Sequence, residues 1–500
     1  MATTELGRTH RRSKGAASHG YFLTGALFFG VLGVVLPLGL ATSVPSGPAM
    51  DWGVLLVQLS VIVYTALRLA SCAASGKPAW FLIVVFGYAY TWLGLTPMVQ
   101  YLARQNPLGV PLDNSTYALQ SVVVLVGLVA FDVVYHVRFR EKPARGKDST
   151  KTFRLLDTRR VVILALIAVA STPVFVQALG GFDVLFTSRQ ARTEVLLDSG
   201  LYSASSKASG AIVTAVASVL PFVALYAMTM ILVYRRELRR KVDFVALYFV
   251  VVCCNIALNN PISSSRFWFL VVCLSVLFVF PWSRSAAGVR AIIGGFVLGS
   301  IVLFPYLDAF RYSDGSRENR GVIQMILEKS DYDSMVQIGN SIKYADVYGY
   351  SFGDNFVGAF FFWVPRMVWP DKPIDTGSSL AQFVNYHHEN LSAPLWAESY
   401  IAFGLVAVVG IFGLFGYLCG RLSRVDAVQR AVLGTISGWT FILVPLSVYV
   451  VLILRGSLLQ SMSRLAVLVA VLLFCTASFK AEVPEKSGRG SASSRNGEVR

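Results

Sequence analysis

Seven basic side chains lie in or beside the polar segments that interrupt an otherwise apolar chain. They are Arg189, Arg192, Arg266, Arg311, Arg366, Lys372 and Arg455. Guanidinium groups bind phosphate oxygens in pairs, so a convergent set of them suits a diphosphate. A single arginine at a helix end is more often an anchor at a membrane surface. Seven on one side favour a shared anionic ligand, and both interpretations stay open.

One carboxylate and two histidines could accept a proton near these cations. Glu398 lies in "PLWAESYIAFG", where a partly desolvated carboxylate would act as a general base or orient a sugar hydroxyl. His387 and His388 in "NYHHEN" could take the same role. The simpler interpretations are a helix-start charge for Glu398 and solvated loop residues for the histidines.

The segment "FFFWVPRMVWPDKPIDTG", which begins at Phe360, combines aromatic rings, prolines and charges. The apolar stretch Asn355–Trp369 is too short to span a bilayer, so we expect an interfacial or re-entrant helix there. Trp363, Trp369 and Tyr350 offer flat apolar faces for sugar rings, and an interfacial aromatic belt explains them about as well.

Sequence signals for other chemistries are missing. The chain has no P-loop, dinucleotide fingerprint or nucleophile elbow, and its six cysteines lack metal-ligand spacing. We therefore expect no metal and no cofactor. Asp132, Asp243 and Asp308 lie near the ends of predicted spans, which counts against a proton-coupled transporter.

The elements that must position these residues are membrane helices. The chain is 55% hydrophobic and 14% charged, which is typical of polytopic membrane proteins. We expect an all-α integral membrane protein with about twelve spans. They lie near Tyr21–Ser43, Trp52–Ala70, Ala79–Leu102, Thr116–His136, Val161–Leu179, Gly210–Tyr234, Asp243–Leu258, Ser265–Trp282, Val289–Phe310, Trp396–Gly420, Ala431–Leu454 and Leu458–Phe479.

The net charge of +16 is distributed as a membrane topology requires and does not indicate nucleic acid. Basic residues fill both tails and alternate loops, which places both termini in the cytoplasm and requires an even number of spans. The predicted order is a basic tail (1–20), nine spans (21–310), a large external loop (311–395), three spans (396–479) and a disordered tail (480–500). Within the external loop, "GVIQMILEKSDYDSMVQIGNSIKYA" has the apolar spacing of a surface helix.

Two motifs carry a resemblance to a known family. "VPRMVWPDKP" and "NLSAPLWAESYIAFGLVAVVGIFGLFGYLCGRL" together resemble the oligosaccharide repeat-unit polymerases, the Wzy-type O-antigen polymerase family. The matching positions are Pro365, Arg366, Trp369, Pro370, Lys372, Pro373, Glu398, Tyr400 and Gly404. "SSSRFWF", "GGFDVLFTSRQAR" and "LRGSLL" are weaker echoes of the same family.

The resemblance implies a GT-C-like glycosyltransferase that needs no metal and works at the outer face of the plasma membrane. It would transfer a growing glycan from its polyprenyl diphosphate to the next lipid-linked unit. Arg366, Arg266 and Arg311 would hold the diphosphate, with Arg189, Arg192 and Arg455 as further candidates. Glu398 would be the base, with His387 or His388 behind it.

Several alternatives stay open at this level. An O-antigen-ligase-like or single-sugar transferase would share the architecture, and a lipid-glycan flippase is a rival of a different class. The implied partners are the lipid-linked oligosaccharide and membrane lipids. A chain-length regulator and the oligomeric state are left open.

Overall fold

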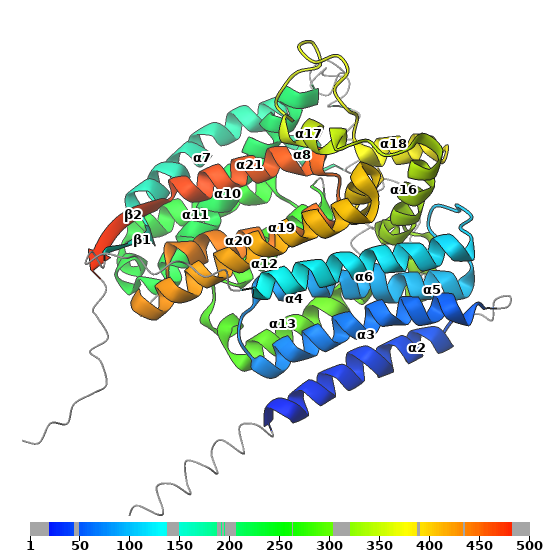
Figure 1. The fold of residues 1–500 in the computed structure, drawn as a ribbon. Helices are drawn as coiled ribbons and strands as arrows, with labels where there is room; N and C mark the ends of the chain where they lie inside the picture. Colours follow the sequence, from blue (N-terminus) through cyan, green and yellow to red (C-terminus); the bar gives the residue numbers. More distant parts are fainter. Residues whose placement is uncertain are drawn as a thin grey trace, which may run out of the picture.

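The computed structural model is a bundle of helices that lie side by side (Figure 1). It describes residues 20–44, 50–137, 150–187, 192, 195, 207–262, 264–303, 321–387, 391–433 and 436–482. A two-stranded sheet lies at one end of the bundle, which we call the sheet end. The short helices α16, α17 and α18 lie at the other end, which we call the loop end.

Among the described residues, eight helices are long and apolar enough to cross a membrane, judged by length and composition. They are Gly20–Thr42, Trp52–Ser75 (α3), Trp80–Ala103, Asn114–His136 (α6), Thr158–Ala178 (α7), Gly210–Tyr234 in α10, Leu395–Leu433 (α19) and Gly438–Arg455 (α20). Four shorter apolar helices are Val242–Leu258 (α11), Arg266–Leu277 (α12), Ala286–Val302 and Leu458–Phe474 (α21). Every predicted span overlaps one of these helices. They fit a multi-pass membrane protein, whereas the count of about twelve and the GT-C-like arrangement stay predictions.

The remaining elements subdivide or connect these helices. They are η1 (Gly30–Val35), α2 (Leu36–Thr42), α4 (Trp80–Tyr88), η2 (Ala89–Leu95), α5 (Thr96–Ala103), α8 (Phe182–Leu185), α10 (Lys207–Tyr234), η3 (Arg236–Arg240), η4 (Pro281–Arg284), α13 (Ala286–Leu298), η5 (Gly299–Leu303), α15 (Val322–Glu328), η7 (Ser330–Tyr332), α16 (Ser334–Tyr348), α17 (Asp354–Phe360) and α18 (Thr376–Phe383).

The segment predicted to form one surface helix forms two helices, α15 and α16, in the structure. Helix α16 packs against α6, α18 and α19, so that every residue from Ser334 to Ile342 is buried. Gly339 permits this approach, because a Cβ there would lie 2.6 Å from Gln120 Oε1 of α6. The apolar spacing of the sequence was therefore read correctly as a helix but wrongly as an exposed one.

The expected interfacial helix over Asn355–Trp369 is much shorter than predicted. Helix α17 ends at Phe360, and the chain continues as a series of tight turns, the 361–375 loop, until α18 begins. Pro365 and Pro370 account for the break, because proline cannot donate the backbone hydrogen bonds that a helix needs.

Helix α19 departs from the predicted span 396–420 in two ways. Its backbone breaks at Phe403 and Gly404, where Gly404 has a φ of 61°. It then runs on to Leu433, through a stretch that we had expected to be a loop. Gly416 lies close to α6, since a Cβ there would meet the Phe131 carbonyl at 2.3 Å, and small residues of this kind let membrane helices pack tightly.

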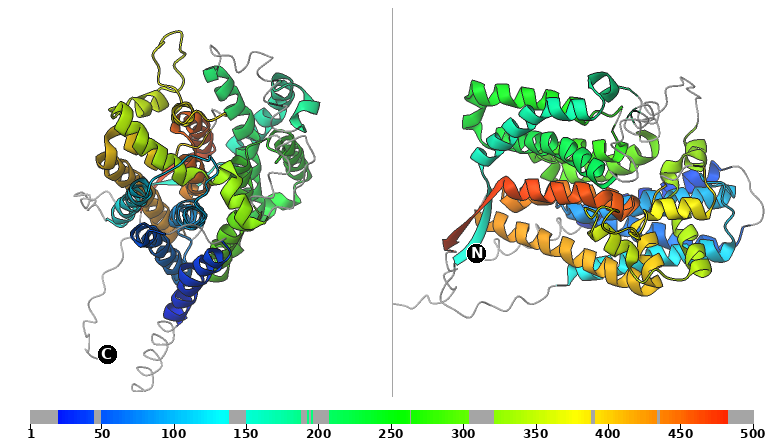
Figure 2. Two further views of the ribbon diagram at one scale, coloured as in Figure 1. Left: turned by 90° about the vertical axis from the view of Figure 1, so that its right-hand side faces the viewer. Right: turned by 90° about the horizontal axis from the view of Figure 1, so that it is seen from above.

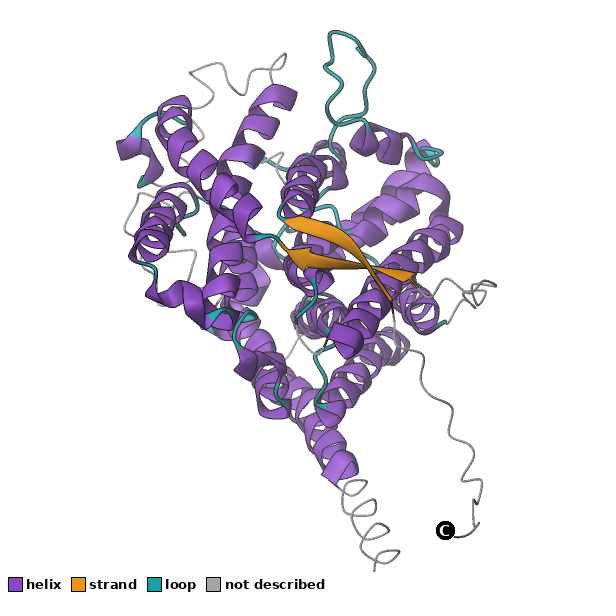
Figure 3. Ribbon diagram, turned by 90° about the vertical axis from the view of Figure 1, so that its left-hand side faces the viewer, coloured by secondary structure: helices purple, strands orange, loops and turns teal. Residues whose placement is uncertain are grey.

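The sheet end contains the structure's strands, which the all-α prediction omitted. Strand β1 (Thr150–Leu156) pairs antiparallel with β2 (Thr476–Glu482), with Phe153 opposite Phe479. Figure 3 shows this sheet across the end of the helices. The predicted tail from residue 480 thus begins inside β2. The side-chain amide of Gln429, near the end of α19, accepts from the Arg154 backbone and donates to the Thr152 carbonyl, which connects the extended helix to β1.

Candidate functional site

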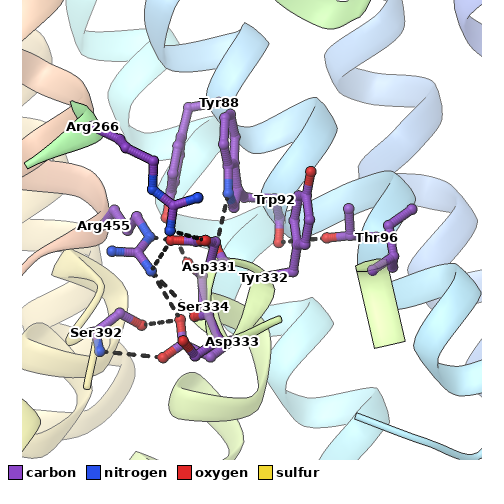
Figure 4. A network of polar contacts seen from close by, with 12 residues as sticks. Tyr88, Trp92, Thr96, Arg266, Asp331, Tyr332, Asp333, Ser334, Ser392 and Arg455 are labelled. Atoms are coloured by element: carbon purple, nitrogen blue, oxygen red, sulfur yellow. Dashed lines mark hydrogen bonds and ion pairs between the residues drawn. The ribbon is translucent and has the colours of Figure 1, made fainter. Parts of the chain in front are cut away.

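A short polar turn lies buried at the loop end of the bundle. It is formed by η7 and by Asp333, the N-cap residue of α16, and carries Asp331 and Asp333 (Figure 4). Trp92 Nε1 donates to the Asp331 carbonyl at 3.0 Å, and Gln100 Nε2 donates to the Tyr332 carbonyl at 2.9 Å. The turn is therefore fixed by hydrogen bonds from the helix formed by α4, η2 and α5.

Two arginines that are far apart in the sequence converge on this turn. Arg266, the first residue of α12, donates from Nη2 to Asp331 Oδ2. Arg455, the last residue of α20, places Nη2 3.7 Å from Asp331 Oδ1 and 3.6 Å from Asp333 Oδ1. Its guanidinium also lies over the Phe267 ring, 4.5 Å from the centroid. We call Arg266, Arg455, Asp331 and Asp333 the arginine–aspartate cluster.

Asp333 is the most deeply buried member of the cluster. Its two carboxylate oxygens accept from Ser392, one from Oγ at 2.6 Å and one from the backbone N–H at 3.2 Å. Burial raises the pKa of Asp333 above its usual range, and the Arg455 guanidinium and the Ser392 donors offset only part of that effect. The cluster is neutral when both aspartates are ionised and carries one positive charge when Asp333 is protonated.

The raised pKa of Asp333 makes a prediction about stability. The folded protein binds this proton more tightly than the unfolded chain, so ionisation costs folding free energy as pH rises above the unfolded pKa of about 3.9. Asp333→Asn keeps the shape and does not ionise. Its melting temperature relative to wild type should therefore increase as the pH rises above about 4. Asp346→Asn, an exposed control in α16, serves as the comparison, and a constant difference for Asp333→Asn would contradict the prediction.

Glu398 forms a second buried polar centre, in the first turn of α19. Only 1% of its surface is exposed. Oε2 accepts from Asn355 Nδ2 at 2.6 Å and Thr376 Oγ1 at 2.8 Å, and Oε1 accepts from the Leu458 backbone N–H at 3.1 Å. Glu398 thus joins α17, α18, α19 and α21, and its predicted role as a base stays a prediction.

The two polar centres are connected through the turn between α20 and α21. The Glu398 carboxylate accepts from the backbone N–H of Leu458, the first residue of α21. Arg455, the last residue of α20, lies on the other side of the turn. Asp375, the N-cap of α18, accepts from Gln460 Nε2 of α21 at 3.0 Å. The position of the Arg455 guanidinium therefore depends on contacts made by α18 and α19.

Arg366 and Lys372 lie together in the 361–375 loop and bind backbone carbonyls of that loop. Lys372 is 6% exposed, and its Nζ donates to the carbonyls of Phe362 at 2.8 Å and Val364 at 3.0 Å. Arg366 donates to the carbonyls of Lys372 and Pro373. Burial lowers the pKa of Lys372. These two cations close the loop, whereas Arg266 and Arg455 share Asp331.

The other predicted site residues lie in different places. Trp363 and Tyr350 are exposed and Trp369 is half-buried. His387 lines an open pocket of about 680 Å³ together with Lys343 of α16 and the loop between α5 and α6. This pocket follows the C-terminal end of α18, whereas Thr376, the partner of Glu398, lies at the opposite end of that helix. Arg192 is buried. Arg189, Arg311 and His388 lie outside the described residues.

Asp331 and Asp333 were missed by the sequence interpretation. The signal was "KSDYDSM", where two acids interrupt an apolar helical pattern, but that pattern was assigned to a solvated surface. Among the described residues, no group of three His, Cys, Asp or Glu side chains is arranged to hold a metal ion.

The helices and this site define the class: a multi-pass, predominantly helical membrane protein with a buried ionic cluster at one end of the bundle. Comparisons of the chain with protein-family models, curated proteins and solved structures find no match.

Proposed function

We propose that this protein is a membrane glycosyltransferase that joins polyprenyl-diphosphate-linked oligosaccharide units into a polysaccharide. In this proposal the chain crosses the plasma membrane about twelve times in a GT-C-like arrangement, with both termini in the cytoplasm and the loop end outside. The observation that carries it is the convergence of Arg266 and Arg455 on Asp331 at one end of a membrane bundle. The sequence resemblance described above supplies the substrate class.

The reaction requires stabilisation of the negative charge that develops on the departing diphosphate. An acceptor sugar hydroxyl attacks the anomeric carbon of the growing chain, the bond from that carbon to the diphosphate oxygen breaks, and polyprenyl diphosphate leaves with the electron pair. Preorganised guanidinium groups stabilise such a developing anion. Arg266 and Arg455 are already held in place by the aspartates, and protonation of Asp333 would make the cluster more attractive to a diphosphate.

The proton of the acceptor hydroxyl needs a base. Glu398 is the candidate, and both of its oxygens accept from protein donors in the described arrangement. It would therefore have to exchange one donor, such as Thr376 or Asn355, for the acceptor hydroxyl. Without that exchange Glu398 acts by positioning the turn that carries Arg455.

The test is a reconstituted reaction. Purified protein in lipid vesicles is supplied with a lipid-linked repeat unit, and the products are separated by size. We expect a ladder of longer glycans and release of polyprenyl diphosphate. Transfer only to a different lipid-linked acceptor would indicate a ligase, and movement of the substrate across the vesicle without a new glycosidic bond would indicate a flippase. Either outcome would overturn the polymerase proposal.

A further inference from the structure

The 361–375 loop presents an unusually apolar tip for a loop of its length. Met367 is 88% exposed and Val368 is 75% exposed, and Phe361, Trp363 and Ile374 are also exposed. Scattered exposed apolar residues are common on proteins, but a cluster of this kind on one protruding segment marks an interaction surface. We call Met367 and Val368, which lie at the middle of the loop, the loop tip.

Hydrogen bonds within the loop fix its conformation and so position the loop tip. Lys372 is buried and donates to two carbonyls on the opposite strand of the loop, and Arg366 donates to two more. Turns at Phe361, Pro365 and Trp369 add backbone hydrogen bonds. These bonds satisfy part of the loop's backbone internally, which lowers the cost of moving this loop into a less polar medium.

The direction of the loop indicates what it meets. In Figure 1 the helices run across the view and the loop between α17 and α18 projects transversely to them. When the bundle is seen along its helices, the same loop extends sideways beyond it (Figure 2, left). Helices that cross a membrane run along the membrane normal, so a sideways projection at the loop end runs along the bilayer surface.

We infer that the loop tip inserts into the leaflet beside the loop end of the bundle and anchors that end to lipid. Apolar side chains together with a tryptophan, on a segment with part of its backbone internally bonded, suit a lipid surface at headgroup depth. The occupant is the bilayer itself, since the loop points into the plane that surrounding lipid occupies. This inference is independent of the proposed enzymatic activity.

The experiment measures where the loop tip lies. A nitroxide is attached at Met367→Cys in the full chain, in a background where the exposed Cys253 and Cys273 are replaced by serine. The protein is placed, one copy per disc, in phosphatidylcholine–phosphatidylglycerol nanodiscs, and power saturation compares access of oxygen with access of a water-soluble nickel chelate. Val347→Cys, another apolar and exposed position, on α16, is the matched control.

We expect the label at position 367 to show a several-fold higher ratio of oxygen to nickel access than the label at position 347. A second label at Val368→Cys serves if Met367→Cys fails to give a monodisperse protein. Equal ratios at 367 and 347 would overturn the inference. Protection that arises only with two copies per disc, or only after polyprenyl diphosphate is added, would also overturn it, because a second chain or a substrate tail would then be the occupant.

Discussion

Arg455→Ala is expected to lower polymer formation by about 100-fold or more, the effect of removing one preorganised donor to a developing anion. Arg455 is the last residue of α20 and reaches Asp331 and Asp333 from a helix that is itself well packed. Arg455→Lys keeps the charge but loses the planar fork that binds two oxygens at once. We therefore expect the lysine variant to retain a fraction of the activity and the alanine variant almost none, as measured by the product ladder.

This prediction needs a control for folding, because Arg455 also pairs with buried acids. Arg104→Ala is a matched substitution at the loop end: the Arg104 guanidinium contacts Asn114 and Tyr101. It should leave the ladder unchanged. Each variant is assayed below its own melting temperature. Normal activity of Arg455→Ala in a folded sample would remove the arginine–aspartate cluster from the mechanism.

Asp331→Asn is expected to destabilise the fold strongly, by about 3–5 kcal/mol, the range for breaking a buried ion pair on one side. Both guanidinium groups of the cluster face this one carboxylate, and its side chain is only 10% exposed. The substitution removes the carboxylate that both guanidinium groups face, and leaves Asp333 as the one carboxylate of the cluster. The melting temperature in detergent micelles should fall clearly, and lipid vesicles should partly restore it.

Asp346→Asn again provides the comparison, because Asp346 lies on the neighbouring helix α16 and is exposed. It should melt like wild type. If Asp331→Asn also melts like wild type, the contacts of Arg266 and Arg455 with Asp331 contribute little to the folded state. The arginine–aspartate cluster would then contribute little to the free energy of unfolding.

The membrane helices could be predicted because their signal is local. A run of about 20 apolar residues is long enough to cross a bilayer whatever its neighbours are. Arg266 and Arg455 were named as candidates for the same reason, since each stands at the end of such a run. Their shared partner could not be predicted, because Asp331 lies 65 residues from Arg266 and no periodic pattern relates the two.

The errors came from environments that only the packed bundle creates. The polar residues of α16 suggested a surface helix, yet Ser334 accepts from the Tyr88 hydroxyl inside the bundle. The anion site at Lys372 and Arg366 stays a prediction, and the sequence did not reveal that backbone carbonyls of their own loop accept from both side chains. The charge of a side chain is visible in a sequence, but the acceptor that it meets depends on how distant segments and turns pack.

The pairing of β1 with β2 has a consequence for synthesis. Residues 150–156 are synthesised before the helices from α7 to α21, whereas residues 476–482 follow all of them. Those helices are therefore synthesised before β1 can pair with β2. A chain that stops before residue 476 leaves the edge of β1 without this partner strand, and unpaired strand edges are prone to aggregation.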